Sequence, residues 1–594
     1  MSVRLVSMLL VSGCLVVSGC TDNDYDFNQI DATIGVGGDG LELPASSTAN
    51  IQLKDVLELE ENGVVVEDEQ THNYVLRQVG SDVPAAHPYI APIHVELKNS
   101  TSQNSLVLSL SSAARKHTAS RSLTATQPVL RGEGEIFEYE YLGNKPDEVK
   151  SLTSVGVDGK MKLHVSLRNI SDKIQQIDKM VVTFPAYMTI SVAETEGVSV
   201  DGNKLVIANR STDTNLDLEV NVSSLDFTKS TDADKLGIVR TNDGEKVQFK
   251  GHVYMSLETS HYSLSGTAST VRVDNNLVMD DMTIRSAVGK FDPDINLANL
   301  GDVKITGVPD FLKDGNVVVD LYNPVINLDI QSNLGIEALV GGTLIAEKDG
   351  QRLATVDVSA FKVNSAEINN GLTHVYICRT TDGLNIPAES QAVVVPNLSD
   401  LVKTIPDKIR FECRALANAN KEGSFELGKI DYRVQPAYSI DAPIAFGEDA
   451  VIEYNDEFDG WNDDIKDYQL ANGASLELTA QVSNGVPAYL NLEATPIDVQ
   501  GNEIPASELE VAVTGTIAAS QDGVTPATSP LSIKVTQKKE EALKKLDGIR
   551  IKVQGKASDG DQKVTGITLN AERHTLKLED IKVKLVGKII ADLN

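Results

Sequence analysis

The 594-residue chain is poor in cysteine, aromatic residues and positive charge. It has four cysteines and one tryptophan, and aromatic residues make up only 5% of it. Its 53 Lys and Arg residues stand against 85 Asp and Glu residues, giving a formal net charge of −32. Because so acidic a surface repels phosphate backbones, we expect no nucleic-acid partner. The low aromatic content also argues against a glycoside hydrolase, since such enzymes usually line their clefts with aromatic side chains.

Common catalytic motifs are missing as well. The nine histidines are scattered, none forms His-Glu-x-x-His, and Gly-x-Ser-x-Gly does not occur. Gly35, Gly37 and Gly40 match a dinucleotide fingerprint only formally, because no strand precedes them and no helix follows. A pair of carboxylates that meets only in the folded chain stays open. We therefore expect a protein that is not an enzyme and has no cofactor, apart from the calcium alternative described below.

Long apolar runs are absent after the N-terminus, so no membrane-spanning helix of about 20 residues is expected there. The apolar run Leu5–Val17 instead suits a signal peptide. The VSGC at 17–20 resembles a bacterial lipobox, whereas cleavage at the VSGC of 11–14 would leave a shorter apolar region. We predict that residues 1–19 are removed and that lipid on Cys20 anchors the chain to the outer membrane.

The acidic residues directly behind this cysteine, Asp22, Asp24 and Asp26, resemble the tract of surface-exposed lipoproteins of Bacteroidales. This similarity favours an anchored protein that faces the cell exterior. Which side of the membrane it faces is nonetheless left open by the sequence.

Two cysteines remain in the mature chain, Cys378 and Cys413, and both lie in strand-like sequence. An exported protein can keep a disulfide, so these residues form either a bridge or two buried thiols. A zinc site is not expected, because no pair of histidines stands near either cysteine at ligand spacing.

The sequence is typical of an all-β protein. Apolar and polar residues alternate with a period of two, which places one face of each strand on a core. Asp-Gly turns separate many of these runs and favour hairpins. The best helix is short, at 540–548. Alternating runs lie at 93–98, 105–111, 163–169, 317–323, 476–482 and 581–585, and the turns at 157–160, 201–204, 242–245 and 348–351.

An internal repeat of about 155 residues organises the chain around Asn169, Asn323 and Asn484, each preceded by a Gly-containing turn and an alternating run. We interpret these asparagines as strand ends whose side chains bond local backbone. The repeat predicts an elongated array of antiparallel β-sandwich-like modules with few short helices. Its predicted parts are a tether at 20–50, an N-terminal β region at 51–140, and modules at 141–295, 296–445 and 446–594.

The chain also resembles a known class of proteins. The lipobox at 17–20 and the segments 300–330 and 442–467 are similar to large secreted lipoproteins of gut Bacteroidales. The resemblance implies an outer-membrane lipoprotein of stacked β modules and carries over no catalytic residue. The strand-Asn-Pro-strand sequence at 317–328 is also similar to water-stress and lipid-binding β folds.

An acidic stretch at 453–467 surrounds the only tryptophan, Trp461. Its carboxylates are candidate calcium ligands, although the order of an EF-hand loop is absent. Trp461 is also a candidate for stacking on a sugar ring. The third interpretation is a solvated loop held by a buried tryptophan. The candidate calcium ligands are Asp456, Asp459, Asp463 and Asp464.

These observations favour a noncatalytic, lipid-anchored cell-surface protein with a structural, adhesive or binding role. Its partners would be the membrane, through Cys20, and surface proteins or glycans. One alternative is a glycan-binding accessory lipoprotein of a polysaccharide uptake system. A second alternative is a lipid-binding β-tube protein, which would need strands apolar on both faces; segments such as 317–328 are consistent with that need but do not require it.

Overall fold

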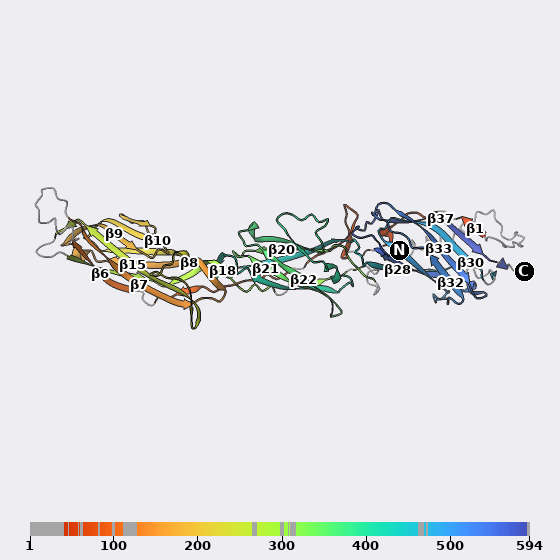
Figure 1. Cartoon of the computed structure of the whole chain (residues 1–594), viewed down its shortest axis with the longest axis horizontal. Coiled ribbons are helices and arrows are strands. Elements are labelled where there is room, and N and C mark those ends of the chain that lie inside the picture. The colour runs from red at the N-terminus through yellow and green to blue at the C-terminus, as the bar shows by residue number, and fades with distance from the viewer. Residues whose placement is uncertain are drawn as a thin grey trace.

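Three β bodies follow one another along the long axis of the computed structural model (Figure 1). We call them the first, middle and C-terminal bodies. The predicted fold class, an elongated array of antiparallel sandwich-like modules, is confirmed. The structure describes residues 41–590 except 45–46, 57–58, 60–62, 81–82, 98–100, 111–127, 264–269, 298–301, 307, 309–316, 461, 463–468, 471–472 and 588.

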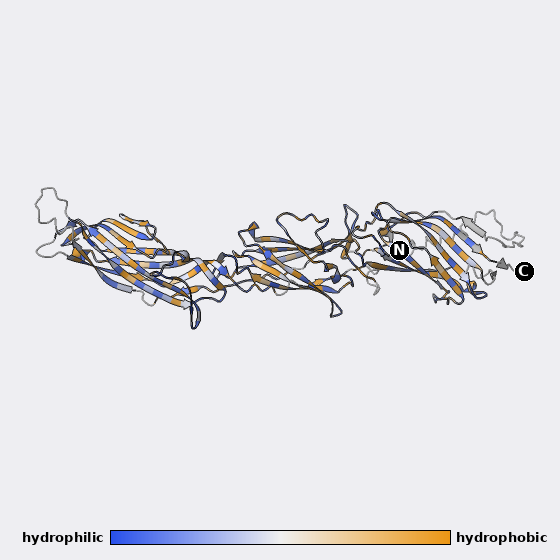
Figure 2. Cartoon of the chain, in the orientation of Figure 1, coloured by the Kyte–Doolittle hydropathy of each residue, from blue (hydrophilic) through white to orange (hydrophobic). Residues whose placement is uncertain are grey.

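The first body is one sheet in the order β10-β13-β8-β17-β6-β7-β15-β9-β12-β11, with β5, β14, β16, β18 and β26 paired onto it. Residues alternate between buried and more exposed along β15, which puts Val253, Met255 and Leu257 on the core. Figure 2 shows this alternation as bands of orange and blue along the strands. Its strands are β5 (Ile93–Val95), β6 (Thr101–Leu110), β7 (Leu130–Asn144), β8 (Val149–Val165), β9 (Ile174–Thr183), β10 (Met188–Val192), β11 (Val198–Asp201), β12 (Lys204–Ser211), β13 (Leu216–Asp226), β14 (Leu236–Thr241), β15 (Gly244–Thr259), β16 (His261–Tyr262), β17 (Thr270–Met279), β18 (Met282–Phe291) and β26 (Gly423–Glu426).

The middle body has two sheets, β19-β25-β21-β22 and β24-β23-β20-β27-β4-β3. All its strand pairs are antiparallel except β23 with β24. Two strands of the second sheet, β3 and β4, come from the N-terminal part of the chain and pair with β27 through β4. The strands are β3 (Val65–Glu67), β4 (Tyr74–Val79), β19 (Asp302–Lys304), β20 (Val325–Ser332), β21 (Ala338–Lys348), β22 (Gln351–Val363), β23 (Leu372–Cys378), β24 (Gln391–Val394), β25 (Lys408–Ala417) and β27 (Val434–Pro443).

The C-terminal body is a sandwich of the sheet β1-β37-β30-β33-β32, with β2 paired to β37, and the sheet β28-β34-β31. The N-terminal strand β1 therefore lies at the same end of the molecule as the C-terminal strands (Figure 1). Its strands are β1 (Leu41–Pro44), β2 (Ile51–Gln52), β28 (Val451–Phe458), β29 (Gln469–Leu470), β30 (Ser475–Asn484), β31 (Tyr489–Ile497), β32 (Leu509–Thr514), β33 (Ala527–Gln537), β34 (Gly548–Lys556), β35 (Ser558–Asp559), β36 (Gln562–Lys563), β37 (Thr575–Val586) and β38 (Ile589–Ile590).

Helices are short throughout the described residues, as predicted. The segment 540–548 forms a single 3-10 turn, η7. Within the described part of the chain, no helix is long and apolar enough to cross a membrane. The helical segments are α2 (Leu53–Val56), η2 (Arg168–Ile170), η3 (Phe227–Lys229), η5 (Asn369–Gly371), η6 (Leu398–Leu401) and η7 (Ala542–Lys545).

Three of the four predicted hairpin turns form, joining β11 to β12, β14 to β15 and β21 to β22. In the first of these turns Gly202 has a φ of +61°, which glycine adopts without strain. The prediction at 157–160 is wrong, because Asp158 and Gly159 lie inside β8. There the register with β13 shifts between Val222 and Ser224, so the Asp-Gly pair accommodates a bulge.

One predicted strand is also missing. Residues 317–323 form only isolated bridges, Val318 to Val451 and Leu321 to Phe446. These bridges tie the middle body to the C-terminal body, so this apolar segment is a connection between cores instead of a strand within one of them.

The N-terminal region predicted as a unit at 51–140 is distributed over all three bodies, because β2, then β3 and β4, then β5 to β7 join different sheets. The end of the predicted tether at 20–50 also belongs to a sheet, since β1 pairs with β37. Of the three repeat asparagines, Asn484 bonds local backbone as expected, because its side chain donates to the Ala488 carbonyl. The prediction is wrong for Asn323, whose side chain accepts from the distant backbone N–H of Arg379 just after β23.

Candidate binding cavities in the C-terminal half

A cavity of about 240 Å³ lies between the two sheets of the C-terminal body. Leu478 and Val482 of β30 line it from one sheet, and Leu490 and Leu492 of β31 line it from the other. The two residues on β30 are four positions apart and the two on β31 are two positions apart. Because side chains alternate along a strand, both members of each pair point to the same face. The alternation that defines the strands therefore also gives the cavity its aliphatic wall. Further lining residues from the strands are Tyr454, Leu531, Ile533, Ile551, Val553 and Leu576.

Small residues leave the space between the sheets unfilled. Gly555 of β34 lines the cavity, and a Cβ placed on it would meet its nearest atom, Leu490 Cδ2, at 3.7 Å. That distance is ordinary van der Waals contact, so the site has room for a side chain that glycine does not supply. Ala488, buried at the same wall, likewise occupies little volume. The sandwich is thus less filled here than a typical protein interior.

The N-terminal segment completes the cavity wall. Ile51 of β2 pairs with Leu576 of β37, and Ile51 and Leu53 both line the cavity. The backbone N–H of Leu53 donates to the His574 carbonyl at 2.9 Å. Residues about 520 positions apart in the sequence therefore form one wall.

His574 is a fully buried residue of the lining. Its Nδ1 accepts from the Asn570 N–H at 3.1 Å, and its Nε2 donates to the Gly523 carbonyl at 3.2 Å. Burial, and then the charge of Arg573, lower the pKa of His574 to about 4. The imidazole is therefore neutral at pH 7, and both its nitrogens are already used by the backbone.

A second, smaller cavity of about 70 Å³ adjoins the first at the boundary with the middle body. Its wall includes Leu76 of β4, Ile326 of β20 and Leu401 of η6. It is also lined by aliphatic side chains almost throughout. Three residues line both cavities: Phe446, Ile452 and Leu569.

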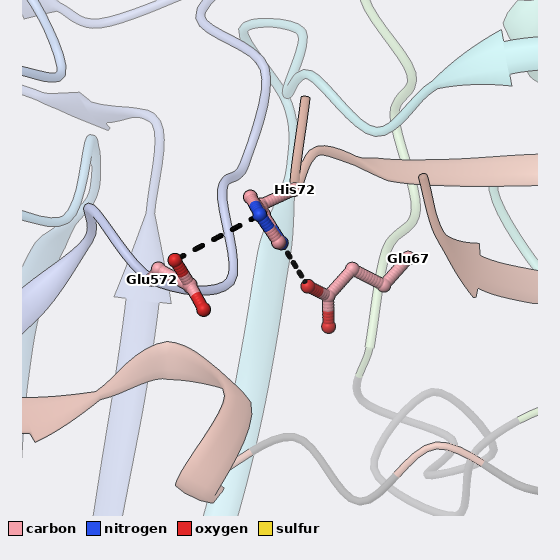
Figure 3. A group of neighbouring side chains, drawn as sticks. All are labelled: Glu67, His72 and Glu572. Atoms are coloured by element: carbon pink, nitrogen blue, oxygen red, sulfur yellow. Dashed lines mark hydrogen bonds and ion pairs between the residues drawn. The ribbon is translucent and has the colours of Figure 1, made fainter. Parts of the chain in front are cut away.

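A polar cluster lies where the N-terminal segment meets the C-terminal body (Figure 3). His72 Nδ1 is 2.6 Å from Glu67 Oε1, and its Nε2 is 3.9 Å from Glu572 Oε2. The hydrogen bond that His72 donates to Glu67, and then the charge of Glu572, raise the pKa of His72. The Lys54 ammonium is 3.4 Å from Glu572 Oε1. The cluster is thus an ion-paired contact between distant parts of the chain.

Glu67, His72 and Glu572 could each offer one ligand atom to a metal ion. The same is true of Glu135, Glu138 and His252 in the first body. In both groups a lysine ammonium already pairs with one of the carboxylates, Lys54 in the first and Lys250 in the second. A cation would have to displace that lysine. Sequence reasoning missed both groups, because their members are brought together only by strand pairing.

The acidic stretch predicted as a loop begins as a strand, since β28 covers 451–458. Glu453 is buried, and its Oε1 lies 2.9 Å from the Lys552 ammonium. Glu457 pairs with Arg550. Two of the seven acids of the stretch therefore stabilise the sheet β28-β34-β31.

Most of the predicted site residues lie outside the part of the chain that the structure describes. Of the candidate calcium ligands, Asp459 is described and exposed. The calcium site and the sugar-stacking role stay predictions. The residues outside the description are Cys20, Gly35, Gly37, Gly40, Trp461, Asp463 and Asp464, together with the side chain of Asp456.

The two cysteines of the mature chain lie on strands of two different sheets of the middle body. Cys378 is buried on β23, and Cys413 is partly buried on β25. Both are free thiols in the structure. The choice between a bridge and two buried thiols stays a prediction. Burial raises the pKa of Cys413 to about 11, so this thiol is protonated at neutral pH.

Comparison with known proteins assigns no family. No family model matches the chain, and no curated protein matches it. Among solved structures, a predicted secreted protein from Parabacteroides distasonis is similar at 14% identity with a TM-score of 0.35, covering 51% of this chain and 90% of its own. PNGF-II is similar at 8% identity with a TM-score of 0.13, covering 77% of this chain and 98% of its own. All these TM-scores lie below 0.5, so the similarities assign neither fold nor function.

Proposed function

We propose that this chain is a noncatalytic, lipid-anchored envelope protein that holds a lipid ligand between the sheets of its C-terminal body. This is the lipid-binding alternative that the sequence leaves open. The observation that supports it is the aliphatic cavity of about 240 Å³ in that body. The anchor on Cys20 and the outer-membrane location follow from the lipobox and are part of the proposal.

The size of the cavity favours an occupant. An apolar cavity of about 150 Å³ stays dry and binds small apolar molecules such as benzene. An empty cavity costs stability, roughly 24 cal/mol for each Å³, so the larger cavity of this chain would cost about 6 kcal/mol. That cost is comparable with the whole stability of a typical domain. A bound apolar ligand would restore the missing contacts.

The position of the anchor also supports a lipid ligand. Cys20 lies 21 positions before Leu41, the first residue of β1. Twenty-one residues span at most about 70 Å even when fully extended. Because β1 belongs to the C-terminal body, an anchor at Cys20 would hold the cavity close to the bilayer. The first body would then point away from the membrane.

The proposal is tested with a cavity-filling variant, Gly555→Leu. The mature chain without its anchor cysteine, residues 21–594, is stripped of bound lipid and titrated with a fluorescent fatty acid. We expect micromolar or tighter binding by the unsubstituted chain and at least tenfold weaker binding by Gly555→Leu, because the new side chain occupies the cavity. The melting temperature should stay equal or rise, since a strand glycine is replaced by an apolar residue with room around it.

The matched control is Gly237→Leu. Gly237 lies in β14 of the first body, and a Cβ placed there meets no atom within 4 Å. This variant should bind the probe like the unsubstituted chain. Equal binding by Gly555→Leu, or no binding by any of the three, would refute the proposal.

The noncatalytic part of the proposal has its own test. The mature chain should hydrolyse no polysaccharide in a substrate screen, and turnover of any glycan would contradict it. Binding on a glycan array without turnover would instead favour the glycan-binding alternative, for which Trp461 is the candidate residue.

A further inference from the structure

The two cavities meet at a common wall. Phe446, Ile452 and Leu569 line both of them, so these side chains stand between the larger cavity and the smaller one. Phe446 has the largest side chain of the three and is 7% exposed. The larger cavity lies in the C-terminal body, whereas the smaller one extends into the middle body against β4, β20 and β27, which are neighbouring strands of one sheet.

The backbone holds this wall in place. Phe446 bridges to Leu321, and its carbonyl accepts from the Gly566 N–H at 3.1 Å. Leu569 donates its N–H to the Ile444 carbonyl at 2.8 Å and accepts from the Tyr74 N–H at 2.9 Å. Since the backbone of the wall is fixed on both sides, the separation of the two cavities depends on the side chains of the wall, of which Phe446 is the largest.

The shape and chemistry of the cavities favour an unbranched acyl chain over a ring system. Packed sheets lie about 10 Å apart, and the lining side chains take up most of that distance, so the free space is narrow. Two narrow cavities that share one wall suit a long thin ligand better than a compact one.

Polar groups in the larger cavity are few. Among the described lining residues only Tyr454 and His574 have a polar side-chain atom, and His574 is neutral with both nitrogens bonded to backbone. A carboxylate or phosphate would find no charged partner among them, so the polar head of the ligand has to stay outside.

On the basis of the proposed function, we infer that the ligand is a single fatty acyl chain and that Phe446 determines the chain length the protein accepts. The end of the chain reaches Phe446 when the larger cavity is full. Removal of the ring joins the two cavities and lets the chain continue toward the middle body.

The experiment measures affinity against chain length. Saturated fatty acids of increasing length displace a fluorescent fatty acid from the delipidated mature chain. Each added methylene should tighten binding about fourfold while it is buried, and the gain should stop once the larger cavity is full. In Phe446→Ala the gain should continue for several more methylenes. Ala442→Val, which fills the smaller cavity, should cancel that extension in the Phe446→Ala background.

Phe411→Ala is the matched control. Phe411 is also 7% exposed, lies on β25 of the middle body and lines neither cavity, so this variant loses the same ring without joining them. It should keep the original length limit. If Phe446→Ala does not fold, Phe446→Leu is measured in its place and should show a smaller extension.

Two negative results would overturn different parts of the proposal. An unchanged length limit in a folded Phe446 variant would overturn the role of Phe446 while leaving lipid binding intact. A chain that binds no fatty acid of any length would overturn the proposed function itself.

Discussion

At the scale of single residues, His574 makes the stability of the C-terminal body depend on pH. Its folded pKa of about 4 lies below the ordinary value of 6.5. Above pH 6.5 the residue is neutral in both states and the stability is unaffected. As the pH falls from 6.5 to 4, the unfolded chain binds a proton that the folded chain does not, so stability is lost. The loss amounts to about 3 kcal/mol at most.

Urea unfolding at pH 7.5 and 4.5 checks this prediction with His574→Gln, which removes the titrating group. The unsubstituted chain should lose about 2–3 kcal/mol more than the variant between the two pH values. Asp522 directly precedes Gly523, the backbone partner of His574, and has a pKa lowered to about 2. The stability that its carboxylate contributes is therefore lost only as the pH falls below 3.8. His94→Gln, at an exposed position, is the control. Equal pH dependence of His574→Gln and the unsubstituted chain would contradict the prediction.

At the scale of elements, the N-terminal segment closes the cavity. Strands β1 and β2 add to β37, and the side chains of Ile51 and Leu53 form part of the wall. A chain that begins at residue 57 loses all of these contacts. We expect such a chain to keep its β-rich circular dichroism spectrum but to release a bound fluorescent fatty acid about tenfold faster, because the wall loses the buried Ile51 and the partly buried Leu53.

Stopped-flow dissociation measures that release rate. A chain that begins at residue 41 keeps β1, β2 and α2 and should release the probe at the rate of the full mature chain. Equal rates for the chains that begin at 41 and 57 would show that the segment does not close the cavity.

At the scale of the whole molecule, the anchor and the elongated shape together predict an orientation. The C-terminal body should lie next to the bilayer and the first body far from it (Figure 1). A lipid with a photoreactive head group, added to cells that make the protein, should therefore label peptides from 446–594 and spare peptides from 128–263. Equal labelling of both regions would contradict the orientation.

The lipid anchor has a simpler test. Cys20→Ala should abolish incorporation of labelled palmitate, because we propose this cysteine as the acceptor of the lipid. Cys14→Ala should leave it unchanged. Incorporation into the Cys20→Ala protein would show that the anchor has been assigned to the wrong residue.

The sequence alone determined the fold class, because the signals for it are local. A period of two along runs such as 476–482 is enough to predict a strand, and β30 forms there. The Asp-Gly turn at 348–351 likewise sets the hairpin of β21 and β22. At 157–160 the same dipeptide failed as a signal, because the neighbouring strand β13 accommodates it as a bulge.

Only the tertiary structure decided where the cavities lie. Alternation shows that Leu478, Leu490 and Ile551 face inward, but it does not show how much space remains when their two sheets meet. That space depends on the size of the inward-facing residues. Gly555 leaves room beside its cross-strand partner Leu490, whose Cδ2 would lie 3.7 Å from a Cβ placed on the glycine. The segment 51–54 likewise bonds to 571–576, about 520 positions away in the sequence. No local sequence pattern predicts such a contact.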